Sequence, residues 1–243
     1  MQASRVNRVS PPPITNEGGA RAHALSIHIP RVRVKPSRVS PAMKSDQLSF
    51  LAPRDVPEGL RYAPDFLGEA EEAELAGRME GLPFRPFEFQ GFLGKRETVS
   101  FGWSYRFDGS GLAKVAPIPE WLLPVRSRAA AFARIEADAL EHALLIKYGE
   151  GAGLGWHRDR PVFGKVIGIS LLSPAPLRFR RRLVLSGVEG AGAKWERFTL
   201  PAEPRSIYLL GGPARSEWEH SLTPVARLRY SITFRTLKAR PQE

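Results

Sequence analysis

The sequence predicts an α+β protein with a β-jelly-roll core, two flanking helices and a disordered N-terminal arm. Pro, Arg and Ser crowd residues 1–46 without sustained periodicity, which is typical of a disordered segment. Two helical patterns follow, and after residue 140 short strand-like segments alternate with Gly and Pro. Many short strands preceded by two helices favour two packed sheets with the helices on one side. We therefore divide the chain into an arm, 1–46, and a folded domain, 47–243.

The charge of the chain indicates its kind of partner. A net charge of +11 favours a polyanion, with nucleic acid before an anionic membrane surface. Eight basic residues and one acid lie within residues 1–45, so the domain after the arm is only mildly basic. For that domain, charge alone is weak evidence for nucleic acid.

Hydropathy and composition limit where in the cell the protein can be expected. No apolar run approaches 18 residues, and the N-terminus lacks a continuous apolar segment, so neither a membrane span nor a secretory signal is expected. We expect a cytoplasmic monomer that does not associate with membranes. An Arg-rich and Ser-rich leader also fits an organelle transit peptide, or an over-long start ahead of Met43.

The two helices are expected over residues 69–80 and 120–137. In the first, acidic residues occupy the first turn and Leu75 and Met79 lie four residues apart. In the second, Pro124 marks either the start or a kink. One face of this second helix carries Trp121, Val125, Ala129 and Phe132.

The strands are expected after these helices. Period-two alternation and bounding turn residues predict Ala143–Tyr148, Val166–Leu171, Leu177–Arg182, Trp195–Leu200, Ser206–Leu210 and Leu228–Thr236.

The absence of cysteine limits any metal site to His and carboxylate ligands. His157 and Asp159 project to the same side of an extended segment because side chains alternate. Two His and one carboxylate on one face is the arrangement of non-heme Fe(II) oxygenases. His220 is the third candidate, because it is the only His downstream. Each of these residues taken alone is more often structural, and we interpret His142 as structural.

The last predicted strand has two different faces. Leu228, Tyr230, Ile232 and Phe234 form an apolar face, and Arg229, Ser231, Thr233 and Arg235 form a polar one. The polar face either meets solvent or lines a cavity that binds a dianion. In the second case the two Arg Cα atoms, about 20 Å apart at roughly 3.3 Å per residue, leave room for a short dicarboxylate between their planar forks.

These motifs together resemble the AlkB family of Fe(II)/2-oxoglutarate dioxygenases. The resemblance is carried by His157-x-Asp159, a distant His220 and the run 229–235, and it extends over roughly residues 59–236. It implies a double-stranded β-helix (jelly-roll) core, with Fe(II) as cofactor and 2-oxoglutarate and O2 as cosubstrates. It also implies succinate and carbon dioxide as products.

The resemblance assigns roles residue by residue. His157, Asp159 and His220 match the iron ligands. Arg229 and Arg235 match the two arginines that hold 2-oxoglutarate, and Tyr148 matches a Tyr that also contacts it. Ile146 stands where the family has an Asn, so one polar contact to 2-oxoglutarate is in doubt.

At the substrate end, residues 95–107 resemble the family's nucleotide-recognition lid. The match indicates Phe101 and Tyr105 as the aromatic frame of a flipped base and Arg96 as a contact to the backbone. The alternative is a β-hairpin whose aromatic residues belong to the core.

Two further features bear on the substrate. Arg178, Arg180 and Arg182 share a strand face and fit either phosphate contacts or a solvated edge strand. The run Arg160-Pro161-Val162 stands where several family members carry acids that contact the exocyclic amine of a methylated base. Recognition therefore differs here, or the substrate is not a base.

The leading functional hypothesis is an oxidative demethylase of alkylated nucleic-acid bases, of the DNA-repair type. The same chemistry on RNA, methylated protein or a small molecule is the runner-up. A catalytically silent nucleic-acid-binding module is the alternative of another class, since a fold alone does not settle function.

Overall fold

The computed structural model describes residues 56–89, 92–183 and 194–238. All of them belong to one compact unit, Met43–Glu243. The predicted arm, 1–46, lies outside the described residues. None of the helices in the described ranges is long and apolar enough to cross a membrane.

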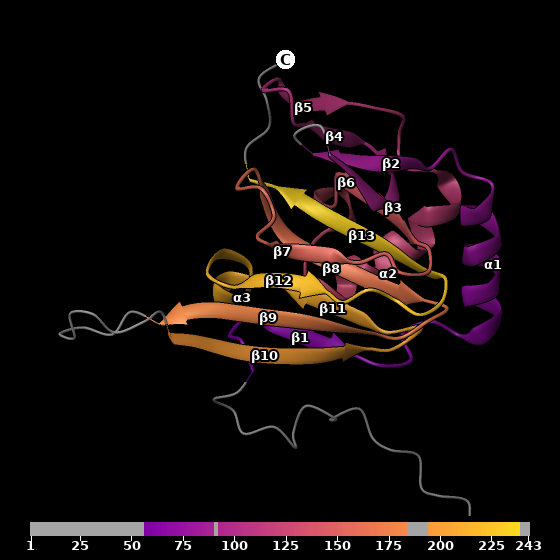
Figure 1. Ribbon diagram of the computed structural model, residues 1–243. Helices are drawn as coiled ribbons and strands as arrows, with labels where there is room; N and C mark the ends of the chain where they lie inside the picture. The colour runs from indigo at the N-terminus through magenta and orange to yellow at the C-terminus, as the bar shows by residue number, and fades with distance from the viewer. Residues whose placement is uncertain (1–55, 90–91, 184–193, 239–243) are drawn as a thin grey trace, which may run out of the picture. The chain divides into compact units, whose positions relative to one another are not determined.

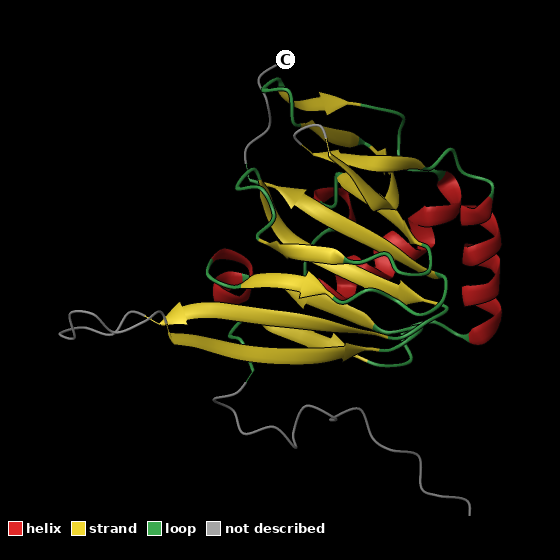
Figure 2. Cartoon of the chain, viewed as in Figure 1, coloured by secondary structure: helices red, strands yellow, loops and turns green. Residues whose placement is uncertain are grey.

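Strands dominate the described chain, and two antiparallel sheets form its core (Figures 1 and 2). The larger sheet has the spatial order β1 (Leu60–Ala63), β11 (Ile207–Leu210), β8 (Phe163–Leu171), β13 (Arg229–Leu237), β6 (His142–Tyr148), β3 (Phe92–Phe101) and β2 (Arg85–Phe89). The smaller sheet has the order β10 (Lys194–Ala202), β9 (Ala175–Leu183), β12 (Glu219–Leu222) and β7 (Leu154–His157). The two sheets form the predicted jelly-roll core. A separate hairpin pairs β4 (Trp103–Arg106) with β5 (Gly111–Lys114).

The first predicted helix is confirmed as α1 (Glu69–Glu80), which buries Leu75 and Met79. The second is shorter than predicted. It consists of a 3-10 turn, η2 (Glu120–Leu122), then α2 (Leu123–Ala133), and it ends where Arg134 adopts a left-handed conformation, with η3 (Ala137–Ala139) beyond it. Pro124 lies in the first turn of α2, where a missing N–H costs nothing. A further short helix, α3 (Gly212–Ser216), precedes β12.

The larger sheet has one apolar face and one polar face. Its apolar face packs on α1 and α2, and the shared core includes Ile167, Ile169, Tyr230, Ile232 and Phe234. Leu228, which the alternation places on this face, instead precedes β13 and is 40% exposed. The polar face of β13 is also buried, as Arg229, Ser231, Thr233 and Arg235 are at most 8% exposed. The solvent alternative for that face is therefore wrong, because the smaller sheet covers it.

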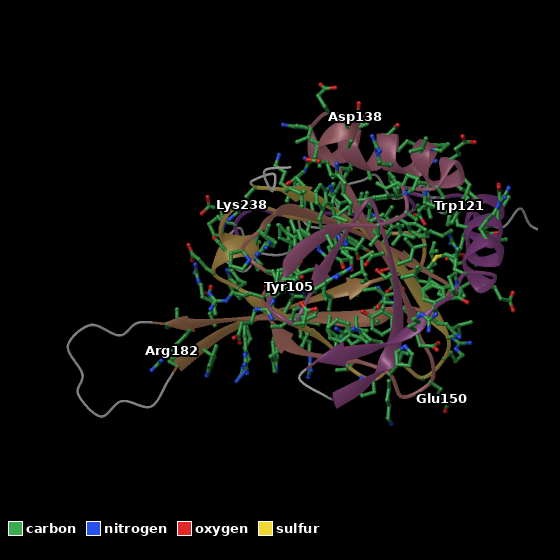
Figure 3. All side chains as sticks on the ribbon, turned by 90° about the horizontal axis from the view of Figure 1, so that it is seen from above. Tyr105, Trp121, Asp138, Glu150, Arg182 and Lys238 are labelled. Atoms are coloured by element: carbon green, nitrogen blue, oxygen red, sulfur yellow. The ribbon has the colours of Figure 1, made fainter. Side chains whose placement is uncertain are left out.

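The smaller sheet corrects a second expectation. Strand β9 lies between β10 and β12, so Arg178, Arg180 and Arg182 are not on an edge strand. The guanidinium of Arg180 lies 4.4 Å from the ring centroids of both Trp156 and Trp195 and pairs with a neighbouring carboxylate. None of the three arginines lines the central cavity. Figure 3 shows Arg182 well away from Tyr105, so any phosphate contact of these residues would lie outside the site described below.

Candidate active site

A cavity of about 1080 Å³ opens between the two sheets. Its walls come from the polar face of the larger sheet, from β7 and β12 of the smaller sheet, and from the hairpin β4–β5. Alternation explains this wall, since every second residue of β3, β6 and β13 points into the cavity while its neighbours pack on the helices.

Three candidate metal ligands meet in this cavity. His157 ends β7, Asp159 follows it by two residues, and His220 lies on β12 directly opposite His157 in the antiparallel register. One ligand atom from each lies within 4.8 Å of the others, and the two imidazole centroids are 4.2 Å apart. The cross-strand pairing therefore brings together the three residues that the sequence pattern selected.

The protonation states of these residues suit a divalent cation. Burial lowers the pKa of His220 to about 3 and also lowers the pKa of His157, so both imidazoles are neutral. Burial opposes ionisation of Asp159, but nearby positive charge, to which Arg235 contributes most, outweighs it and holds the pKa of the carboxyl well below its usual range. Metal ligands must be deprotonated, and all three are.

Second contacts orient the candidate ligands. Nδ1 of His157 lies 2.9 Å from the carbonyl oxygen of Gly155, to which it donates, and this leaves Nε2 for a metal. Arg235 approaches both carboxylate oxygens of Asp159, with Nε 3.3 Å from Oδ2 and Nη2 3.4 Å from Oδ1. His142 lies beside Arg235 in the cavity wall, with its Nδ1 3.4 Å from Nη1 of Arg235. Here Arg235 holds the carboxylate, in addition to the predicted role toward 2-oxoglutarate.

Arg229 provides the test of whether the cavity fits a dicarboxylate. Its side chain is only 2% exposed, its Nη2 donates to Ser170 Oγ at 2.7 Å, and its guanidinium carbon lies 5.2 Å from the Tyr148 ring centroid. Its Nε has no hydrogen-bond partner among the described residues. A buried guanidinium without an anion is costly. A carboxylate of 2-oxoglutarate would complete its hydrogen bonds, so the residues present fit the cosubstrate.

Two polar residues near Arg229 are not among those that the sequence pattern indicated. Ser170 on β8 accepts its hydrogen bond, and Tyr208 on β11 lines the same part of the cavity. Burial raises the pKa of Tyr208 to about 12, so its hydroxyl stays protonated and available as a donor. The alternation of side chains along residues 206–210 could have indicated Tyr208, because it places this residue on the opposite face from its apolar neighbours.

Gly168 makes room for Tyr208 and provides a prediction. The two residues are directly paired, and a Cβ on Gly168 would lie 2.1 Å from Cζ of Tyr208. We expect Gly168→Ala to displace the ring, to lower stability by about 1–3 kcal/mol, and to raise the 2-oxoglutarate KM about fivefold or more. Thermal unfolding and steady-state kinetics measure both effects. Gly77→Ala in α1, where a Cβ meets open space, is the control: it should leave the KM unchanged and raise stability by up to about 1 kcal/mol, because alanine favours the helix interior. An unchanged KM in a folded Gly168→Ala protein would contradict a role for Tyr208 toward 2-oxoglutarate.

At the substrate end of the cavity, the structure differs from the predicted role of Phe101. On β3, Arg96, Thr98 and Ser100 point into the cavity, so Phe101 lies on the opposite face. Phe101 is 9% exposed and belongs to the hydrophobic core between the sheet and the helices. Its predicted contact with a base is wrong, and the core alternative holds for this residue. Tyr105, on β4, does line the cavity.

Arg96 also lies on the cavity wall, as the lid resemblance predicted. Its guanidinium carbon lies 3.9 Å from the ring centroid of Phe87. Burial lowers the pKa of Arg96 without removing its charge at neutral pH. Its role toward a nucleic-acid backbone stays a prediction.

The placement of Phe101 and Tyr105 predicts two different mutant phenotypes. Phe101→Ala should lower the free energy of unfolding by about 3–5 kcal/mol, because it opens a cavity in the core. Tyr105→Ala should leave the melting temperature almost unchanged and slow turnover of a base substrate about fivefold or more, through loss of a stacking surface. Thermal denaturation and substrate-dependent succinate release separate the two. A stable Phe101→Ala protein with a selective substrate defect would restore the original assignment.

The fold and the triad together define a mononuclear non-heme iron oxygenase. A family model described as the 2OG-Fe(II) oxygenase superfamily matches residues 59–235. The chain belongs to this superfamily, whose members use Fe(II), 2-oxoglutarate and O2, and the residues of the cavity fit that cofactor and cosubstrate.

Individual relatives confirm the resemblance to AlkB-like members. The chain is 25% identical over 186 residues to the "Alkylated DNA repair protein ALKBH8 homolog" of Arabidopsis thaliana, covering 67% of this chain and 50% of the relative. It is 28% identical over 110 residues to the "Probable RNA/DNA demethylase ALKBH6" of Danio rerio, covering 45% and 44%. The chain thus spans about half the length of these curated relatives. The fold matches the structure titled "The structure of OsALKBH1" with a TM-score of 0.54 and 16% identity, over 74% of this chain and 97% of that one.

Proposed function

We propose that this dioxygenase removes N-methyl groups from alkylated nucleic-acid bases. The observation that carries the proposal is the composition of the cavity rim. Arg96, Arg158, Arg160 and Lys238 line it, and Asp159 is the only carboxylate among the described lining residues. Such a rim attracts a polyanion and repels a cationic peptide.

The aromatic residues of the rim suit a flat ligand. Phe87, Tyr105 and Phe107 line the cavity on the side of β2 and the β4–β5 hairpin. Figure 3 shows Tyr105 and Lys238 as seen from above the molecule. A volume of about 1080 Å³ exceeds the usual size of a pocket for one small ligand, so it has room for 2-oxoglutarate and an extruded base.

The chemistry balances for an N-methyl substrate. When bound, Fe(II) with 2-oxoglutarate and O2 would supply the oxidising power, and the overall reaction would balance with one oxygen atom in succinate, carbon dioxide released, and the other oxygen atom on the carbon of the methyl group. The resulting N–CH2OH releases formaldehyde and leaves N–H on the base. For this chain, the assignment is that His157, Asp159 and His220 hold the iron, Arg229 holds a carboxylate, and the rim holds the base.

A succinate-release screen tests the proposal. The purified protein is supplied with Fe(II), 2-oxoglutarate and O2, and with methylated or unmethylated DNA, RNA or peptide of matched sequence. Methylated nucleic acid should stimulate succinate and formaldehyde release together. Stimulation by a methylated peptide or a small molecule alone would overturn the proposal in favour of that substrate class. Tight nucleic-acid binding without turnover would favour a silent binding module.

A further inference from the structure

The residue that follows Asp159 extends into the substrate end of the cavity. The guanidinium carbon of Arg160 lies 5.1 Å from the ring centroid of Tyr105 and 4.9 Å from that of Phe107. The two rings meet edge to face at 5.2 Å. The backbone of Arg160 is also held, because its carbonyl accepts a hydrogen bond of 2.7 Å from Nη2 of Arg215. Contacts at both ends therefore restrict where this guanidinium can lie.

The N–H groups of Arg160 are available to a ligand. Among the residues that the structure describes, its side chain has these two ring contacts and no hydrogen bond or ion pair. A guanidinium packed against aromatic rings keeps its fork of donors free, and such a fork binds paired acceptors such as the oxygen and nitrogen on an edge of guanine. Arg160 thus presents donors, and no acceptor, to whatever occupies the substrate end.

The rest of the cavity is equally poor in negative charge. Its described lining includes the cations Arg96, Arg158, Arg160, Arg215, Arg229, Arg235 and Lys238. Asp159 is the only acid among these lining residues, and Arg235 already pairs with it. An exocyclic amine would therefore find no free carboxylate on this wall, whereas a carbonyl oxygen would find charged donors.

Methylated bases divide along this chemical difference. In 1-methyladenine and 3-methylcytosine an amine flanks the methylated nitrogen, and the ring carries a positive charge at neutral pH. In 1-methylguanine and 3-methyluracil a carbonyl oxygen takes the place of that amine, and the ring is neutral. A wall of cations repels the first pair and donates hydrogen bonds to the carbonyl oxygen of the second.

We propose that Arg160 selects N-methylated bases that carry a carbonyl oxygen beside the methylated nitrogen. This inference rests on the proposed demethylase function and names the substrate class of the same site. The position of Arg160 supports it, since consecutive Cα atoms lie about 3.8 Å apart. The guanidinium of Arg160 packs on Tyr105 at the substrate end, so a base bound there with its methyl group toward the metal ligands would meet these donors at its neighbouring edge.

Two matched substrate pairs test the inference. Succinate and formaldehyde release are measured on single-stranded oligonucleotides that contain 3-methyluracil or 3-methylcytosine, and 1-methylguanine or 1-methyladenine, in the same sequence, as DNA and as RNA. Within each pair the carbonyl-bearing base should have the higher kcat/KM, by about tenfold or more. The ratio of kcat/KM for the carbonyl-bearing base to kcat/KM for the amine-bearing base should fall in Arg160→Gln and fall further in Arg160→Glu. In Arg160→Glu this ratio should be one or less.

Arg158→Glu is the matched control. Arg158 is also exposed on the cavity rim and undergoes the same change of charge, but its guanidinium donates to the carbonyl of Ser216 at 3.3 Å and not into the substrate end. This variant should slow both members of a pair and should change their ratio far less than Arg160→Glu does, because it alters the charge of the rim without removing the donors at the substrate end. Melting temperatures of all variants show whether a lost ratio reflects lost folding, and Arg160→Gln is the milder change if Arg160→Glu does not fold.

The outcomes separate two kinds of failure. A preference of the unaltered protein for the amine-bearing bases, or no preference, would overturn the inference and leave demethylation standing. The inference also falls if the ratio survives in folded Arg160→Glu, or collapses equally in Arg158→Glu. If none of the four methylated bases stimulates release above the unmethylated oligonucleotide, the proposed function itself fails.

Discussion

Replacing His220 with alanine is expected to remove bound iron and to lower 2-oxoglutarate turnover by more than about 100-fold. Losing a residue that merely supports a metal ligand already costs about 10- to 100-fold in affinity or activity, and losing a ligand should cost more. His220 is 9% exposed and lies opposite His157 on the neighbouring strand, so no other His among the described residues can take its place. Iron content after reconstitution and the rate of succinate release measure the effect.

His142→Gln is the control for this experiment. His142 is similarly buried and lies in the same cavity, beside Arg235, but it is not one of the three converging ligands. Its replacement should leave the iron content unchanged. If His220→Ala retains full iron content while His142→Gln loses it, the assignment of the third ligand is wrong.

Replacing Arg229 with alanine is expected to raise the 2-oxoglutarate concentration needed for half-maximal turnover by about 30-fold or more. Truncating one partner of a buried, charged hydrogen-bonded pair costs about 2–5 kcal/mol. Arg229 is 2% exposed, with a free Nε and Ser170 as its hydrogen-bond partner, so its substitution should act on the cosubstrate and much less on nucleic-acid binding. Turnover as a function of 2-oxoglutarate and a separate oligonucleotide titration compare the two affinities.

Two further variants make the result specific. Arg229→Lys keeps the charge but loses the planar fork, so it should give an intermediate KM. Arg128→Ala removes an arginine that pairs with Glu71 on the helical side of the molecule, and it should leave the 2-oxoglutarate KM unchanged. An unaltered KM in Arg229→Ala would exclude this residue from the cosubstrate site.

Local patterns in the sequence determined much of the secondary structure and part of the site. The acidic first turn and the apolar pair Leu75 and Met79 sufficed to bound α1, because helix periodicity and dipole compensation act within a few residues. Alternation likewise placed Arg229 and Arg235 on one face of β13, and His157 and Asp159 on one side of their segment. These relations depend on local backbone geometry alone, so they can be predicted without knowing how distant parts of the chain pack.

Only the tertiary structure decided what each face meets. Whether the polar face of β13 borders solvent or a cavity depends on the smaller sheet, and the same alternation that exposes Arg96 to the cavity buries Phe101 against the helices. Three contacts in the site join segments that lie far apart in the chain. They are the cross-strand pair of His220 with His157, the position of Tyr208 over Gly168, and the contact of Arg160 with Tyr105. Periodicity specifies which side chains share a side, but long-range strand pairing selects the neighbours they face.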